Sequence, residues 1–179
     1  MTALNINLRL FLENLLFFFS VTSFLIVVGW AWKHAKPYRI PEPLPKWFKL
    51  WFSTVQILGV FLPLLVMVLW GVLWGYTSVL TVIAWYFVML GLQILSESIS
   101  VKLFNSVIWV MVPYLYVPYR IWQMYEGLTL LGSANQLWWV QNLLILEIIL
   151  WTGNYALNVS QLPRLLGWEL TQESAVNLN

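Results

Sequence analysis

Continuous apolar runs, separated by short polar stretches, make up most of the chain. Each run is about 20 residues long, the length that an α-helix needs to cross roughly 30 Å of hydrocarbon. The strands of a membrane barrel would instead alternate apolar and polar residues over shorter segments. The pattern therefore predicts an all-α fold, a polytopic transmembrane helical bundle. Five spans are expected, at about residues 10–32, 50–76, 79–95, 103–121 and 137–155.

The stretches between the runs are expected to lie at the membrane surface. The longest, at residues 33–49, is basic and proline-rich, and its segment 41–45 (Pro-Glu-Pro-Leu-Pro) favours an extended backbone. The others are a short turn at 75–78, a tight polar connection at 96–102, a mixed stretch at 120–136 that suits an interfacial helix, and a polar tail at 158–179.

Proline interrupts two of the predicted spans. Pro63 lies in the middle of the second run and should kink its helix. Pro113 and Pro118 make the fourth run the least regular of the five. The main alternative is therefore a bundle of four spans with a re-entrant segment at 103–121.

Composition agrees with a location in lipid. Of the 179 residues, 61% are hydrophobic and only 9% are charged, whereas soluble domains carry about 25% charged residues. The absence of cysteine excludes disulfides and thiolate metal sites. The formal net charge of +2 is too small for a nucleic-acid binder, so the expected surroundings are the lipid bilayer and other membrane subunits.

The basic residues predict the orientation of the chain. With five spans, the side of the 33–49 loop receives seven of them and the opposite side two. Cytoplasmic loops carry the excess of Lys and Arg, so the amino terminus is expected outside and the carboxyl terminus inside. The first set is Lys33, Lys36, Arg39, Lys46, Lys49, Lys102 and Arg164; the second is Arg9 and Arg120.

Glu147 is the leading candidate for a functional side chain. It lies near the middle of the fifth run, among leucines and isoleucines. A charge at that depth costs roughly 2.5–3.5 kcal/mol on insertion scales. The carboxyl should therefore be neutral, paired or turned toward the bundle interior, where Asn154 follows it two turns later on the same face. It could bind a proton, an ion or a pigment, or it could hold two helices together by a hydrogen bond.

Two further polar pairs lie inside the predicted spans. Glu13 and Asn14 lie about one turn into the first run, where side chains reach water by snorkelling. Gln93 and Glu97 are four residues apart and so share a helix face, and Lys102 could pair with Glu97 across the expected connection. Both pairs suit helix-end polar contacts as well as a functional site.

Aromatic residues and the single histidine suggest a possible cofactor. Trp85 and Trp109 lie about six residues inside the third and fourth runs, where an indole N–H needs a partner. With Tyr86, Phe87, Tyr114 and Tyr116, they could pack two helices together, line a site for a carotenoid or chlorophyll, or receive a partner subunit's helix. His34 could ligate a chlorophyll magnesium or a haem iron, or be an ordinary interfacial side chain.

One pattern resembles a known family. Gln93 and Glu97, followed by Pro113, Tyr116 and Arg120, are similar to a motif of an uncharacterised family of multi-spanning membrane proteins of cyanobacteria and plastids. The resemblance covers about 30 residues. It implies a thylakoid membrane or the plasma membrane of a photosynthetic prokaryote and no known activity.

No catalytic motif is present, and one histidine without aspartate or cysteine disfavours a lipid-modifying enzyme. The sequence favours a non-enzymatic membrane subunit or assembly factor that docks in a larger complex, photosynthetic and pigment-binding if the resemblance holds. The alternative is a small transporter or channel that uses Glu147.

Overall fold

The described part of the chain is built of helices alone, as the sequence predicts. The computed structural model describes residues 3–33, 46–104, 107–132 and 135–163. Most of the proline-rich loop, with His34, and the end of the tail lie outside these ranges. The helices are α1 (Ala3–Ala31), α2 (Lys46–Gln56), η1 (Ile57–Phe61), α3 (Leu62–Val66), η2 (Met67–Leu73), α4 (Thr77–Phe104), α5 (Ile108–Leu131), η3 (Asn135–Leu137) and α6 (Trp138–Ser160).

Four helical segments are long and apolar enough to cross a membrane. They are Asn7–Ala31, Lys46–Leu73, Thr77–Phe104 and Trp138–Ser160. The chain is thus an integral, multi-pass membrane protein in contact with a lipid bilayer. Its outward faces agree, since large apolar side chains such as Leu16 (71% exposed) and Leu50 (72%) point away from the bundle.

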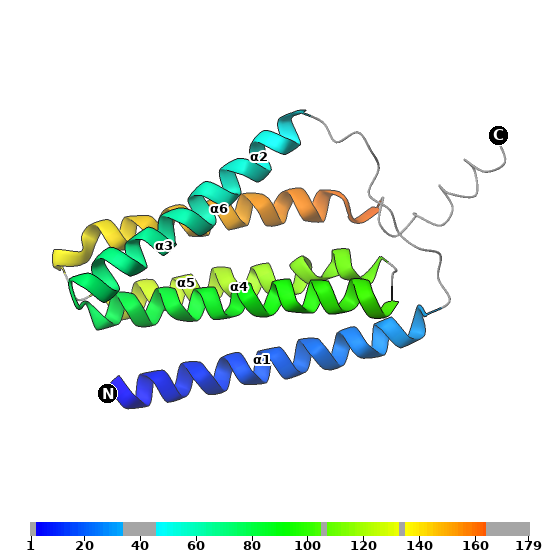
Figure 1. Cartoon of the computed structure of the whole chain (residues 1–179), viewed down its shortest axis with the longest axis horizontal. Helices are drawn as coiled ribbons and strands as arrows, with labels where there is room; N and C mark the ends of the chain where they lie inside the picture. The colour runs from blue at the N-terminus through cyan, green and yellow to red at the C-terminus, as the bar shows by residue number, and fades with distance from the viewer. Residues whose placement is uncertain (1–2, 34–45, 105–106, 133–134, 164–179) are drawn as a thin grey trace.

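The fourth predicted run differs most from the sequence prediction. It was expected at 103–121, but α5 begins at Ile108 and continues as one helix to Leu131, through both prolines and most of the stretch expected to be interfacial. It runs beside α4 along the bundle and does not turn back as a re-entrant segment would (Figure 1). It carries Arg120, Gln123 and Glu126 and is not among the four candidate spans.

The third predicted run is also longer than expected. Residues 96–102, expected to form a polar connection, belong to α4, which extends to Phe104. The expected turn before it is present, and Gly75 adopts a φ of 75°, a conformation that side chains with a Cβ rarely adopt. The Tyr76 N–H donates to the Trp70 carbonyl across this turn, 3.0 Å away.

The second predicted run forms one helical rod of changing pitch. It begins four residues earlier than expected, at Lys46, and is α-helical in α2 and α3 but π-helical in η1 and η2. Pro63 lies in α3, between the two π-helical stretches. The irregularity expected from proline therefore takes the form of widened turns around it.

The two ends of the bundle differ in their exposed basic residues. α1, α4 and α6 end, and α2 and α5 begin, at the same end (Figure 1). This end, which we call the basic end, carries the exposed residues Lys33, Lys46, Lys49 and Lys102. Arg9 lies near the opposite end, where α1 begins. Exposed tryptophans occur near both ends, Trp30 and Trp47 near the basic end and Trp74 and Trp138 near the other, as expected for interfacial belts.

Glycine lets three helices meet. α5 packs most closely against α4 and α6. Gly127 of α5 is buried at this junction, and a Cβ there would lie 2.5 Å from Cγ1 of Val82 and 3.4 Å from Cδ1 of Leu144. Small residues are the usual means by which membrane helices approach closely.

Replacing Gly127 by leucine should destabilise the bundle. The added side chain would collide with Val82, and overpacking of this kind costs about 1–3 kcal/mol. Thermal unfolding in detergent measures the effect. Gly91→Leu on α4 is the matched control, because no atom lies within 4 Å of a Cβ built there. Equal losses in the two variants would contradict the close packing at Gly127.

Candidate functional site

Arg120 lies in the interior of the bundle, half-way along α5. It was expected at the outer end of the fourth span, but α5 continues for eleven residues beyond it, and its side chain is 0% exposed. The physical reason is that neither Pro113 nor Pro118 ends the helix. Arg120 therefore leaves the outer set of basic residues, and only Arg9 remains there.

Two aromatic rings enclose the Arg120 guanidinium. Its central carbon lies 3.9 Å from the ring centre of Trp151 on α6 and 5.8 Å from that of Tyr86 on α4. A cation over an indole face, away from water, gains about 2 kcal/mol or more. Among the described residues, none of the three guanidinium nitrogens has a hydrogen-bond partner. The two rings therefore leave the hydrogen-bonding capacity of the guanidinium unsatisfied.

Carboxyl groups on two helices face this cation. Glu147 of α6 and Glu97 of α4 both interact electrostatically with Arg120. Glu147 is 2% exposed, and Trp151, one turn later on the same helix, donates its indole N–H to Oε2 at 3.0 Å. The other oxygen, Oε1, has no hydrogen-bond partner in the described structure. Within the described structure neither carboxyl forms an ion pair with the guanidinium, so the two opposite charges help to make it tolerable in lipid from a longer distance.

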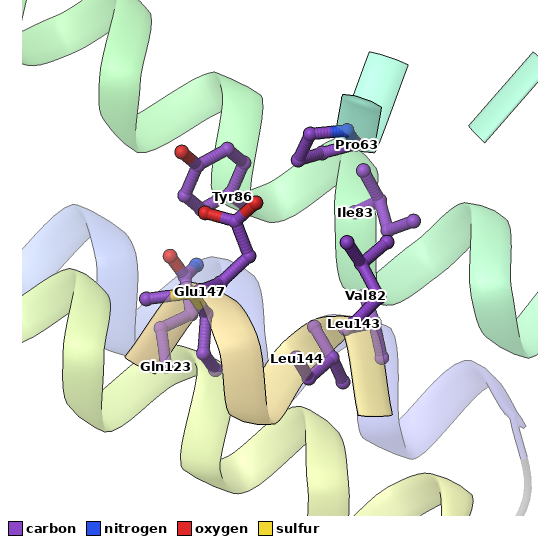
Figure 2. Close-up of a pocket in the computed structure, with 9 residues that line it drawn as sticks. Pro63, Val82, Ile83, Tyr86, Gln123, Leu143, Leu144 and Glu147 are labelled. Carbon is purple, nitrogen blue, oxygen red and sulfur yellow. The ribbon is translucent and has the colours of Figure 1, made fainter. Parts of the chain in front are cut away.

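A small cavity lies beside Glu147. Its volume is about 10 Å³, the space of roughly one water molecule. Figure 2 shows Glu147 and Tyr86 reaching into the same space from α6 and α4, with Pro63 to their right. Gln123 of α5 also lines it and follows Arg120 by three residues, hence on the same face.

Toward the basic end, polar contacts continue from Arg120. Gln93 donates its amide N–H to Glu97 Oε1 at 2.7 Å, and the hydroxyls of Ser96 and Tyr116 lie 2.9 Å apart. The motif residues Gln93, Glu97, Tyr116 and Arg120 thus gather in one region. Pro113 lies one turn from Tyr116 within α5 and takes no part in these contacts.

The expected pairing of Lys102 with Glu97 is wrong. No ion pair joins them in the described residues, where Lys102 is exposed. Because the expected connection is helical, residues five apart point roughly 140° away from each other.

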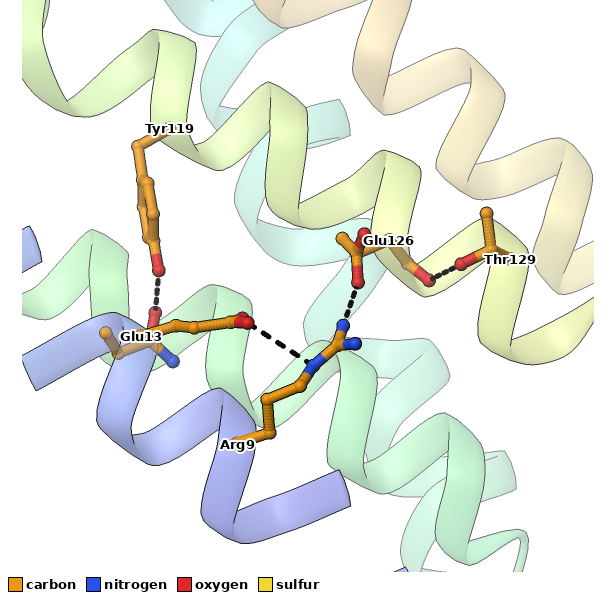
Figure 3. A network of polar contacts seen from close by, with 6 residues as sticks. Arg9, Glu13, Tyr119, Glu126 and Thr129 are labelled. Carbon is orange, nitrogen blue, oxygen red and sulfur yellow. Dashed lines mark hydrogen bonds and ion pairs between the residues drawn. The ribbon is translucent and has the colours of Figure 1, made fainter. Parts of the chain in front are cut away.

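Toward the opposite end, a second network joins α1 to α5 (Figure 3). Arg9 pairs with Glu13 at 3.3 Å and with Glu126. Asn14 is 4% exposed, and its Oδ1 accepts hydrogen bonds from the Tyr119 hydroxyl at 3.0 Å and from Gln123 Nε2 at 3.3 Å. Asn14 is therefore turned toward α5 and does not snorkel toward water.

Asn154 accepts a hydrogen bond from the Trp51 indole at 3.1 Å, which joins α6 to α2.

Trp85 packs against Phe11, with ring centres 6.2 Å apart, and lines a small space with Gly127 near the end of α5 opposite the basic end. Trp109 is the second residue of α5, at the basic end.

Trp85 and Trp109 therefore lie toward opposite ends of the bundle, because α4 and α5 run in opposite directions (Figure 1). Tyr116 packs edge-on against Phe17, and Tyr114 lies near Tyr155. The hypothesis of a pigment site at these residues stays a prediction.

Sequence reasoning missed Tyr86, Gln123 and Trp151 as members of the site. Helical spacing was the signal available for two of them, since Gln123 is three residues from Arg120 and Trp151 four from Glu147. Among the described residues, no three His, Cys, Asp or Glu side chains gather as a metal site.

The chain matches no protein-family profile, no curated protein and no solved structure. The resemblance to the cyanobacterial and plastid family stays a prediction.

Arg120 and Glu147 should be energetically coupled. Removing one partner of a buried pair costs about 3–5 kcal/mol, so Arg120→Met and Glu147→Leu should each destabilise the protein. The double variant should lose less than the sum, by about 1–3 kcal/mol. Unfolding in detergent gives the four free energies. A parallel cycle of Arg120→Met with Lys102→Met, an exposed control, should show additivity; additivity in both cycles would rule out the pair.

Proposed function

We propose that the chain is a five-span, non-enzymatic membrane protein that moves protons across the membrane through its interior. The observation that carries the proposal is the fully buried Arg120, which faces one carboxyl on α4 and another on α6. Ionisable residues inside a membrane are costly and commonly belong to proton or ion pathways.

Polar side chains occupy successive levels of the bundle. From the amino-terminal end of α1 toward the basic end, α5 contributes Glu126, Gln123, Arg120 and Tyr116, spaced three to four residues apart and hence along one side of the helix. Glu147 stands beside Gln123 at the cavity, and Glu97 interacts with Arg120 from the basic side. This order supports a path along α5.

The small cavity favours protons over larger solutes. A space of about 10 Å³ beside Glu147 accepts roughly one water molecule, and the described residues contain no metal-ligating cluster. A proton needs only carboxyls and one or two waters in hydrogen-bond reach. In this proposal Glu147 and Glu97 carry the proton in turn, and Arg120 stabilises whichever carboxyl is ionised.

Proton flux into vesicles tests the function. Purified protein in liposomes that contain a pH-sensitive dye should acidify the lumen faster than protein-free liposomes when a potassium diffusion potential, negative inside, is applied. Glu147→Gln should reduce the rate to that of protein-free liposomes, because an amide cannot carry the proton. Lys102→Met, an exposed control, should keep the wild-type rate. Wild-type flux no faster than the protein-free background would refute the proposal.

The proposed path also requires that α5 cross the membrane. Its 24 residues measure about 36 Å, enough to span the hydrocarbon. With five crossings, the amino terminus lies outside and the basic end lies at the cytoplasmic side, where positive charge is expected.

Cysteine labelling tests this topology, since the chain has no cysteine of its own. Single cysteines at the exposed positions Lys33, Thr77 and Gln161 can be reacted with an impermeant reagent in oriented vesicles. Lys33→Cys and Gln161→Cys should label from the same side, and Thr77→Cys from the other. If Gln161→Cys labels together with Thr77→Cys, α5 does not cross.

The second candidate is the docking subunit or assembly factor favoured by the sequence. Its support is α2, whose amino-terminal part diverges from the rest of the bundle in Figure 1 and which buries only Val55, near its other end. Its exposed aromatic residues, Trp47, Phe48 and Phe52, would suit a partner helix as well as lipid. A stoichiometric partner retained in mild detergent, without flux in liposomes, would favour this function over proton transfer.

A further inference from the structure

The backbone carbonyl of Gly59 lacks its α-helical donor because of Pro63. In an α-helix this carbonyl would accept the N–H of residue 63, four positions later, and proline has no N–H. The helix is widened here, with the Leu62 N–H bonded to the Ile57 carbonyl. The hydroxyl of Tyr86, on α4, donates to the Gly59 carbonyl. A carbonyl that lost its ordinary donor in the membrane thus gains a donor from a neighbouring helix.

Gly59 also brings the indole of Trp151 against the backbone. A Cβ at position 59 would lie 3.0 Å from Cζ2 of Trp151, closer than side chains normally pack. Any larger residue would push the ring away from η1. The absence of a side chain therefore sets how close the indole stands to η1.

One hydrogen-bonded chain runs from this carbonyl to the Glu147 carboxyl. The Trp151 indole N–H is shared between Tyr86 Oη, at 3.0 Å, and Glu147 Oε2, at 3.0 Å. Tyr86 can accept this bond because its own proton is committed to Gly59. The ring centre of the same indole lies 3.9 Å from the central carbon of the Arg120 guanidinium. The orientation of the Tyr86 phenol therefore fixes the position of the Trp151 indole. The indole in turn fixes the positions of the Glu147 carboxyl and the Arg120 guanidinium.

We infer that Pro63, through the freed carbonyl of Gly59, makes Tyr86 and Trp151 positioning residues that hold the Glu147 carboxyl beside Arg120. A helix-breaking residue on one helix thus acts on a carboxyl of another helix. The inference rests on the proposed role of Glu147 as a proton carrier, and it identifies what fixes that carrier in place. Of the described ionisable groups, Tyr86 from α4 and Arg120 from α5 face Glu147.

Infrared spectroscopy of the purified protein tests the inference on the carboxyl itself. The stretching band of the Glu147 carboxyl, the C=O stretch of the protonated form or the antisymmetric stretch of the carboxylate, is identified by its loss in Glu147→Gln. Tyr86→Phe removes the hydroxyl that holds the indole and keeps the ring. Pro63→Ala restores an N–H that competes for the Gly59 carbonyl. Because the indole N–H is shared between Tyr86 and Glu147, both changes should commit it more fully to the carboxyl and move the band to lower frequency.

The double variant gives the sharpest result. Because both changes break the same chain, Tyr86→Phe with Pro63→Ala should move the band no further than Tyr86→Phe alone. Tyr119→Phe, whose hydroxyl bonds Asn14, and Pro113→Ala, a proline inside α5, are matched controls that should leave the band in place. A wild-type band in Pro63→Ala, or shifts that add in the double variant, would overturn the inference.

The outcome is separable from that of the flux experiment. Shifted bands in a protein without proton flux would leave the positioning chain intact and refute only the proposed function. Flux that depends on Glu147, with an unmoved band in both variants, would leave the function and refute the positioning chain.

Discussion

The buried charge of Arg120 constrains the rest of the bundle. A guanidinium that is 0% exposed among lipid-facing helices is tolerable only where opposite charge and aromatic faces surround it. Two helices each supply one carboxyl and one aromatic ring: α6 supplies Glu147 and Trp151, and α4 supplies Glu97 and Tyr86. Once α5 carries the cation, α4 and α6 must lie on either side of it. The order of the three helices follows from this requirement.

Close packing makes this arrangement possible. Gly127 lets α5 meet Val82 of α4 and Leu144 of α6 at the level just beyond Gln123. Gly59 does the same for the rod that runs from α2 to η2, which meets the Trp151 indole directly. Small residues thus stand where backbones approach, and the large aromatic rings occupy the space between them. The resulting interior leaves room for about one water beside Glu147.

The same contacts connect structure with the proposed function. A carboxyl that carries protons must sit where its charged form is stabilised but not locked into one pair. Arg120 interacts electrostatically with two carboxyls on different helices, and within the described structure it forms an ion pair with neither. The α1 network of Arg9, Glu13 and Glu126 lies toward the outer end of this path. It holds α1 against α5 even though most of the surface of α1 is apolar and faces outward.

Sequence alone determined the features that depend on local chemistry. Long apolar runs specify membrane helices whatever their partners, and Gly75 specifies a turn because its φ of 75° suits glycine. The unusual depth of Glu147 could be read from its neighbours in the chain. Helix ends near proline and charge could not be read in this way. Arg120, after two prolines, suited a surface position as well as a buried one.

Only the tertiary structure decided between those positions. Burial of Arg120 is favourable because residues 27 to 34 positions away along the chain, Glu147, Trp151 and Tyr86, supply its compensation. The bond from Tyr86 to Gly59 likewise joins two helices across 27 residues. The sequence marks Pro63 as a missing donor but does not name the group that replaces it. That choice depends on which helix packs beside the freed carbonyl, which is a property of the assembled bundle.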